Sequence, residues 1–218
     1  MIISRDRRYI FVHIPKTGGT AMALALERRA MANDILIGDT PKAKRRKGRL
    51  KDVQTAGRLW KHATLADVEG LVTRAQMAEF MTFTLVRNPW DRVVSYYHWL
   101  QTQGFDHQAV RLAKDQSFAD FVGDAQTQAS LRAAPYASYM RDGAGQEHCT
   151  HFVRLEHLTT DLAPIAQHLG FAIDMTRANA SERRADWHSY YDVKTAAIID
   201  DVCAEDIARF GYSFDDSA

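Results

Sequence analysis

The chain has 218 residues, of which 46% are hydrophobic and 25% are charged, and its formal net charge is +1. This length suits one α/β domain with a substantial core and is short for two, and the charge argues against wholesale nucleic-acid binding. Two cysteines are too few for a disulfide framework or a cysteine metal site, and no run of 18 apolar residues predicts a spanning helix. Because the N-terminal residues also lack the apolar core of a signal peptide, we expect a cytoplasmic location.

The first informative segment is an apolar run at residues 9–14 that leads into a Gly-rich turn. The turn reads His13-Ile14-Pro15-Lys16-Thr17-Gly18-Gly19-Thr20. An Ala-, Leu- and Met-rich helix is expected over 19–33, so the pattern is typical of a strand, a phosphate loop and a helix. A Walker P-loop places its Lys after the glycines, whereas Lys16 precedes them. The pattern therefore predicts a P-loop-like site for a nucleotide anion, but not the usual ATP pose.

The residue types in this loop suit anion binding. Gly18 and Gly19 let backbone N–H groups close on an anion without a Cβ in the way. The hydroxyls of Thr17 and Thr20 add donors, and the positive end of the following helix adds its dipole. Lys16 supplies a charge that would meet a leaving group.

A basic connection follows over residues 38–52. Seven cations crowd part of it: Lys42, Lys44, Arg45, Arg46, Lys47, Arg49 and Lys51. Two interpretations stay open: a mobile solvated loop, or a cationic lid over the nucleotide or an acidic glycan acceptor. Further on, Thr64 and Asp67 form the pattern of a capping box, which predicts a helix over 65–74.

A second motif lies at residues 81–101. A buried strand is expected over 81–87, and Asn88 is a suitable N-cap for a helix that runs from Pro89 to about Gln101. Arg87 at the end of the strand can turn its guanidinium toward the helix, where Ser95 presents a hydroxyl. An Arg with a nearby hydroxyl suits a second phosphate, because a guanidinium grips it with two hydrogen bonds.

The remaining elements complete an α/β pattern. They are expected as a helix capped by Ser117 and ending at Val122, partial helix over 126–141, a strand over 151–156, a helix ending near Gly170 and an amphipathic helix over 192–209. Strands separated by helices favour a single domain spanning 1–218, with a central parallel sheet flanked by helices. Ligands then bind at the carboxyl ends of the strands, where both motifs lie.

The two motifs in this order resemble the 3′-phosphoadenosine-5′-phosphosulfate (PAPS)-dependent sulfotransferases, and most closely the carbohydrate 2-O- and chondroitin-type branch with its bacterial relatives. The resemblance implies that Lys16–Thr20 hold the 5′-phosphosulfate and that Arg87 and Ser95 hold the 3′-phosphate. Looser likeness continues through Phe152–Leu158, Asn179–Ser181 and Phe210–Tyr212. The cytosolic small-molecule enzymes carry an Arg-Lys-Gly element near the C-terminus, where this chain offers only Arg183, Arg184 and Trp187.

The resemblance implies an enzyme that moves a sulfuryl group from PAPS to a hydroxyl or amine acceptor by in-line displacement. A carbohydrate is the acceptor expected for the family, PAPS is the co-substrate, and no metal is needed. Lys16 would stabilise charge on the oxygen that bridges sulfur to the 5′-phosphate. Two alternatives are a P-loop-like nucleotide kinase or hydrolase, and a non-catalytic polyanion-binding module that uses residues 42–51.

The reaction also needs a base for the acceptor proton, and histidine suits this role because it titrates near physiological pH. We favour His62, which precedes the capping-box pattern and lies between the two motifs, where carbohydrate-type relatives place their catalytic histidine. His13 is expected to pack against the loop or tune it. Glu156 is the second choice for the base, with His98 next.

Overall fold

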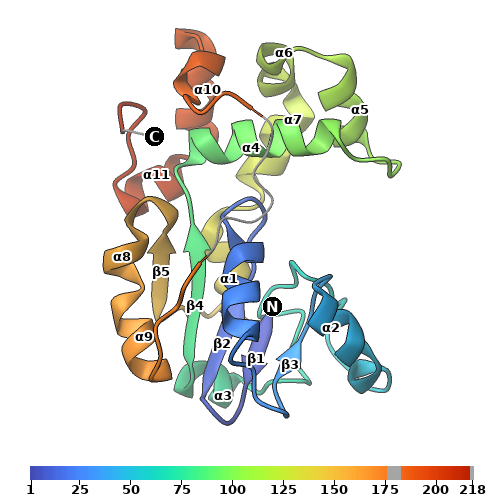
Figure 1. Cartoon of the computed structure of the whole chain (residues 1–218). Coiled ribbons are helices and arrows are strands. Elements are labelled where there is room, and N and C mark those ends of the chain that lie inside the picture. Colours follow the sequence, from blue (N-terminus) through green and yellow to red (C-terminus); the bar gives the residue numbers. More distant parts are fainter. Residues whose placement is uncertain (176–182, 217–218) are drawn as a thin grey trace. The chain divides into compact units, whose positions relative to one another are not determined.

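The computed structural model describes residues 1–175 and 183–216, which divide into two compact units (Figure 1). The sheet unit comprises residues 1–86 and 136–175, and the helical unit comprises residues 87–135 and 183–216. Of the segments that carry the looser family likeness, Asn179–Ser181 lie outside the described residues.

The sheet unit is built on a five-stranded mixed sheet. Its spatial order is β3 (Ile35–Leu36), β1 (Ile2–Ser4), β2 (Tyr9–Val12), β4 (Met81–Val86) and β5 (His151–Arg154). The α/β prediction is confirmed, and β2, β4 and β5 are parallel as expected. β1 and β3 add two antiparallel pairings that were not expected. Only residues 5–8 connect β1 to β2, and so short a connection permits only an antiparallel pair.

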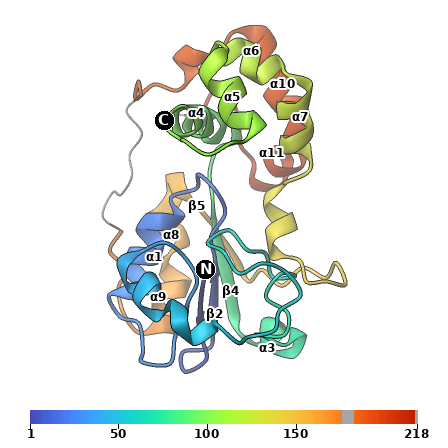
Figure 2. The same ribbon diagram turned by 90° about the vertical axis from the view of Figure 1, so that its right-hand side faces the viewer.

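The two faces of this sheet are covered differently. The sheet unit contains α1 (Gly19–Glu27), α2 (Pro41–Arg46), α3 (Arg74–Glu79), α8 (Leu158–Asp161) and α9 (Ala163–Leu169), with 3₁₀ turns η1 (Lys47–Leu50), η2 (Tyr136–Met140) and η3 (Leu155–His157). Figures 1 and 2 show α1, α8 and α9 on the same side of the strands. Non-helical segments and α3 lie on the other side.

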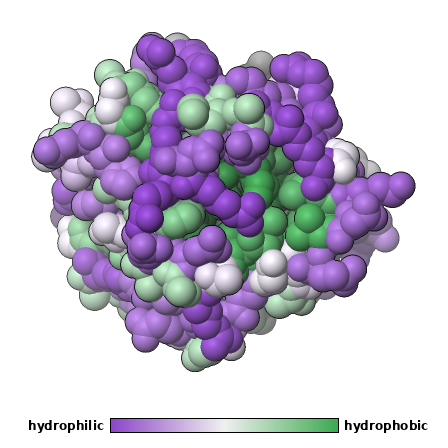
Figure 3. All heavy atoms as spheres, turned by 90° about the horizontal axis from the view of Figure 1, so that it is seen from below, coloured by the Kyte–Doolittle hydropathy of each residue, from purple (hydrophilic) through white to green (hydrophobic). Residues whose placement is uncertain are grey.

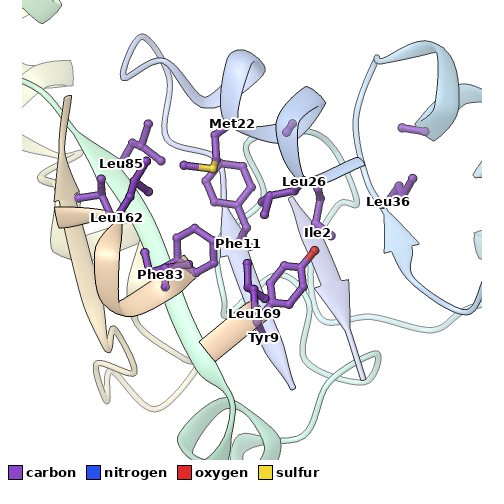
Figure 4. Close-up of a cluster of buried hydrophobic side chains, with 14 residues drawn as sticks. Ile2, Tyr9, Phe11, Met22, Leu26, Leu36, Phe83, Leu85, Leu162 and Leu169 are labelled. Atoms are coloured by element: carbon purple, nitrogen blue, oxygen red, sulfur yellow. The ribbon is translucent and has the colours of Figure 1, made fainter. Parts of the chain in front are cut away.

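The core of the sheet unit has two layers, one on each face. In the first, Phe11 of β2 and Phe83 of β4 have ring centroids 5.4 Å apart and pack under Met22 and Leu26 of α1 (Figure 4). The second layer contains the alternate strand residues together with the segment 59–72 and α3. The period-two alternation of β2 therefore supplies both layers.

The helical unit surrounds α4. It contains α4 (Pro89–Gln101), α5 (Gln108–Asp115), α6 (Phe118–Gly123), α7 (Ala125–Arg132), the 3₁₀ turn η4 (His188–Tyr190), α10 (Val193–Val202) and α11 (Ala204–Phe210). The Trp90 indole N–H of α4 donates to the carbonyl oxygen of Ala196 in α10 (3.0 Å). α4 has its predicted bounds, with the Asn88 side chain accepting from Trp90 N–H (3.1 Å), and Ser117 caps α6 as expected.

The predicted helix over 65–74 is wrong. Thr64 and Asp67 do exchange the expected hydrogen bonds, but these close an isolated turn. Gly70 then adopts φ +97°, which no right-handed helix tolerates, and α3 begins only at Arg74 with Thr73 as its N-cap. A capping pattern stabilises the first turn of a helix, but it does not ensure that a second turn follows.

Two further segments differ from expectation. The helix over 192–209 is interrupted at Cys203, which separates α10 from α11. The basic connection over 38–52 contains a short helix, α2, because the Thr40 hydroxyl caps it by accepting from Ala43 N–H (3.1 Å).

Within the described part of the chain, the helices are all too short or too polar to span a bilayer. The face seen in Figure 3 is mostly hydrophilic, with a smaller hydrophobic area in its central hollow.

Candidate active site

The loop between β2 and α1 is built by an unusual backbone. Lys16 has φ +67° and Gly18 has φ +86°, so two residues of the turn are left-handed. Gly18 is also the N-cap of α1, and its carbonyl oxygen accepts from Ala21 N–H (3.0 Å). Conformations of this kind turn successive N–H groups toward a common centre, which is how backbone makes an anion-binding concavity.

A side chain at either glycine of the loop would be strained, at Gly18 by its φ of +86° and at Gly19 by close packing. A Cβ on Gly19 would lie 2.0 Å from Cδ2 of His13, so the imidazole occupies the space that any side chain would need. A Cβ on Gly18 would lie 2.9 Å from Cδ1 of Leu155, which directly follows β5. The loop therefore rests on His13 on one side and on the end of β5 on the other.

The N–H groups of the loop fit an anion such as a phosphosulfate. Among the residues that the structure describes, no backbone carbonyl accepts from the N–H of Gly18, Gly19 or Thr20. They open α1, where the helix dipole is positive. The hydroxyl of Thr17 is fully buried and donates to the carbonyl oxygen of Ile14 (3.0 Å), so it closes the loop on itself. Its expected role as a donor to the anion therefore requires that this bond be exchanged.

His62 lies directly against the first residue of the loop. Its Nδ1 is 2.8 Å from the carbonyl oxygen of His13, and the two imidazole centroids are 4.6 Å apart. A carbonyl oxygen only accepts, so Nδ1 carries the proton and Nε2 keeps its lone pair. The indole of Trp60 meets the same imidazole edge-to-face, with centroids 5.1 Å apart.

The electrostatics keep both histidines neutral at physiological pH. Burial lowers the pKa of His62 to about 4, with the nearby charge of Lys61 adding to this, while the hydrogen bond to His13 opposes the shift. Burial, followed by the proximity of His62, lowers the pKa of His13 well below its ordinary range. The neutral, Nδ1-protonated form of His62 is the form that a general base needs.

The second motif has its arginine held by a carboxylate. Arg87 directly follows β4, and its Nε donates to Oδ2 of Asp91 (2.8 Å) in the first turn of α4. Arg183 pairs with the other oxygen of the same carboxylate, Oδ1, at 2.5 Å. All three side chains are largely buried, so Asp91 sets the position of two guanidinium groups at once. Ser95, the other predicted residue, is buried two turns along the same helix.

Sequence reasoning missed Asp91 and Arg183 as members of this cluster. Asp91 lies four residues after Arg87 on a helix, a spacing that signals an ion pair. Arg183 lies 92 residues after Asp91, and no sequence signal connects the two.

The other candidates for the base have different surroundings. His98 belongs to the helical unit, where its ring packs on Tyr190 with centroids 5.0 Å apart. Burial, with help from Arg183, lowers the pKa of His98. Glu156 is exposed on η3, one residue after Leu155.

The basic segment is largely helical, in α2 and η1. Nη1 of Arg46 donates to the carbonyl oxygens of Met31 (2.9 Å) and Asp34 (3.1 Å), and Arg49 donates to that of Ala32 (2.5 Å). The exposed cations of the segment are Lys44, Arg45, Lys47, Arg49 and Lys51.

A pocket of about 700 Å³ lies wholly in the helical unit. Aromatic rings of Trp90, Tyr191 and Phe214 line it, together with the carboxylates of Asp192 and Asp200. Among the described residues around it, none is Lys or Arg. It is therefore unsuited to a polyanionic nucleotide. No group of three or more metal-ligating side chains occurs among residues 1–175 and 183–216.

Comparison with known proteins establishes the family. The model of the sulfotransferase family matches residues 1–213, so the chain belongs to that family. The family and the enzyme class predicted from the two motifs are confirmed: the chain is a sulfotransferase.

The fold is also similar to that of mouse sulfotransferase SULT7A1 complexed with PAP. The sequence identity is 15% and the TM-score is 0.52, over 94% of this chain and 86% of that chain. At this identity the likeness shows the fold alone. No curated protein matches the sequence.

Proposed function

We propose that residues 1–218 act as one sulfotransferase domain that moves a sulfuryl group from PAPS to a hydroxyl or amine, with a carbohydrate as the acceptor, in the cytoplasm. The family match spans residues from both units, which supports a single functional domain. The roles proposed for individual residues rest on the geometry of each motif.

The donor is held by the two anion-binding motifs. Backbone N–H groups of Gly18, Gly19 and Thr20, with the side chains of Lys16 and Thr17, bind the 5′-phosphosulfate. The loop N–H groups, which have no backbone acceptor among the described residues, and the strain that a side chain would cause at either glycine support this assignment. Arg87 and Ser95 bind the 3′-phosphate, and the carboxylate of Asp91 holds the Arg87 guanidinium ready for it.

Transfer is an in-line displacement in which the acceptor oxygen or nitrogen bonds to sulfur as the bond from sulfur to the bridging oxygen breaks. Lys16 stabilises the negative charge that grows on the departing phosphate oxygen. His62 accepts the acceptor's proton at Nε2. The single observation that carries this proposal is the hydrogen bond between His62 Nδ1 and the His13 carbonyl, because it puts a correctly protonated imidazole beside the loop.

The carbohydrate acceptor is proposed from the family resemblance. The exposed cations of Lys44, Arg45 and Lys47 on α2 and η1 suit an acceptor that carries negative charge. Arg46 and Arg49 anchor this segment to neighbouring carbonyl oxygens, so it forms a fixed surface.

The experiment that tests the function is incubation of the protein with PAPS and a panel of alcohols, amines and oligosaccharides, read by mass spectrometry. We expect a gain of one sulfate on at least one acceptor, without added Mg²⁺, and a much slower gain with the Lys16→Ala variant. A protein that binds 3′,5′-bisphosphoadenosine yet sulfates nothing in the panel would contradict the proposed acceptor class. Failure to bind the bisphosphate would contradict the donor site.

A further inference from the structure

Trp60 is an exposed aromatic residue on a segment whose neighbours are fixed. Its side chain is 45% exposed, whereas Ala63 is fully buried and Leu59 packs against the second core layer. The carbonyl oxygen of Trp60 accepts from Ala63 N–H (3.0 Å), so the backbone here forms a closed turn. The indole therefore projects from a rigid position and contributes little to the core.

The indole of Trp60 contacts the imidazole of His62, the proposed base. The ring centroids of Trp60 and His62 are 5.1 Å apart and the ring planes meet at 85°. Nδ1 of His62 is engaged by His13, so Nε2 is the atom left for an acceptor hydroxyl. The indole and the imidazole that would receive the acceptor's proton are therefore neighbouring rings on one segment.

Single exposed hydrophobic residues are ordinary on protein surfaces, so exposure alone carries no argument. Met31 is such a residue, at 39% exposed, and its hydrogen bonds all run through its backbone. Trp60 differs because its ring is in direct contact with the group that would take the acceptor's proton. An exposed indole has a negative face that attracts the slightly positive C–H bonds on one face of a sugar ring.

We propose that Trp60 determines acceptor specificity by stacking on a ring of the acceptor, holding its hydroxyl at Nε2 of His62. This inference rests on the proposed function, and it names the part of the acceptor that the enzyme recognises: a sugar ring with a C–H-rich face. Acceptor molecules without such a ring gain no contact with Trp60.

The test measures acceptor binding directly. The protein saturated with 3′,5′-bisphosphoadenosine is titrated by calorimetry with cello-, chito- and unsulfated chondroitin oligosaccharides. We expect at least one series to bind, Trp60→Ala to weaken that binding by about 10-fold or more, and Trp60→Phe to recover most of it. Met31→Ala is the matched control and should bind as the wild type does. Affinity for the bisphosphate should be unchanged in all three variants.

Turnover gives a second readout. With saturating PAPS, Trp60→Ala should raise KM for the bound oligosaccharide by the same factor while kcat stays within about twofold, because the base itself is intact. Unchanged oligosaccharide affinity in Trp60→Ala would overturn the proposal, as would failure of every oligosaccharide to bind. In the latter case, sulfation of a simple alkyl alcohol or amine would leave the proposed sulfuryl transfer standing but not its carbohydrate acceptor.

Discussion

Lys16 combines a charge with a backbone conformation that its side chain does not favour. A left-handed conformation costs a non-glycine residue roughly 1–2 kcal/mol, and Lys16 adopts one at φ +67°. The next left-handed residue, Gly18, bears no such cost. The proposed role of the ammonium group gives a reason for a lysine at a position that glycine would occupy at lower cost.

Lys16→Ala tests this directly. Alanine pays the same backbone cost as lysine, so the variant removes the charge and little else. We expect kcat to fall by on the order of 10²–10³, because one stabilising contact to the leaving oxygen is lost, with a smaller loss of PAPS affinity. A loss of PAPS affinity with an unchanged kcat would show that Lys16 binds the ground state and the transition state equally. Single-turnover kinetics and calorimetry measure the two quantities.

The role of His62 as general base is tested by the kcat of a variant and by the pH dependence of the wild type. His62→Ala is expected to lose on the order of 10²–10⁴ in kcat while retaining PAPS affinity. With a pKa of about 4, His62 is unprotonated at neutral pH, so kcat/KM in the wild type should fall only as pH drops toward 4. Bound PAPS is anionic and raises this pKa, so the acidic limb of kcat should lie at higher pH. A normal kcat in the variant moves the search to Glu156 or His98.

At the scale of elements, sequence patterns located the parts of the site that depend on local rules. The strand, the loop and the start of α1 follow from residues adjacent in sequence, and α4 follows from its N-cap Asn88 and the proline after it. The same local reasoning failed over 65–74, where a capping pattern is followed by a left-handed Gly70. It could not find Arg183 beside Asp91, because only tertiary packing brings these two residues together.

The contact between Gly19 and His13 connects α1 to the base. The ring of His13 packs on Gly19, and the carbonyl oxygen of His13 accepts a hydrogen bond from His62. A displacement of His13 would therefore affect both α1 and His62. The loop, the buried imidazole and the base therefore form one packed unit within the sheet unit.

Gly19→Ala should damage both binding and catalysis. The new Cβ would lie 2.0 Å from the His13 ring, which must move and carry its carbonyl with it. We expect a loss of stability of about 1–3 kcal/mol, as for other overpacked sites, and a fall in kcat beyond any loss of PAPS affinity. Gly48→Ala is the control, since a Cβ there meets nothing within 4 Å. Equal behaviour of the two variants in thermal melts and kinetics would refute the coupling.

At the scale of the whole molecule, the neutral histidines make folding depend on pH. The folded-state pKa of His62 is about 4, below the ordinary value of about 6.5, so the unfolded chain binds more protons between these values. The stability contributed by neutral His62 is therefore complete above about pH 6.5 and is lost as pH falls toward 4. The upper limit of this term is about 3 kcal/mol.

Urea denaturation at pH 7.5 and pH 4.5 measures this dependence. We expect a lower midpoint at pH 4.5, and a smaller difference in His62→Gln, which keeps a polar side chain but does not titrate. His13 shifts in the same direction, so part of the dependence should survive the substitution. A variant with the same pH dependence as the wild type would show that the pKa of His62 is the same in the folded and the unfolded protein.

A comparison of nucleotides with one and two phosphates tests both anion-binding motifs together. 3′,5′-Bisphosphoadenosine offers a phosphate to each motif, whereas AMP has none for Arg87 and Ser95. One desolvated, charge-assisted contact is worth on the order of 2–3 kcal/mol, so the bisphosphate should bind on the order of 30–150-fold more tightly than AMP. Calorimetry that gives equal affinities for the two ligands would sink the assignment of the second motif.

Arg87→Ala should remove most of this preference by weakening the bisphosphate while leaving AMP nearly unchanged. The ratio of the two affinities is the proper measure, because loss of the Arg87–Asp91 pair also destabilises the fold and that effect cancels in the ratio. Arg111→Ala provides the matched control, since Arg111 makes only an exposed ion pair with Asp106 in the same unit. Ser95→Ala should lower the ratio in the same direction but by less, because a neutral hydroxyl contributes about half as much as a guanidinium. A preference that survives both Arg87→Ala and Ser95→Ala would place the 3′-phosphate elsewhere.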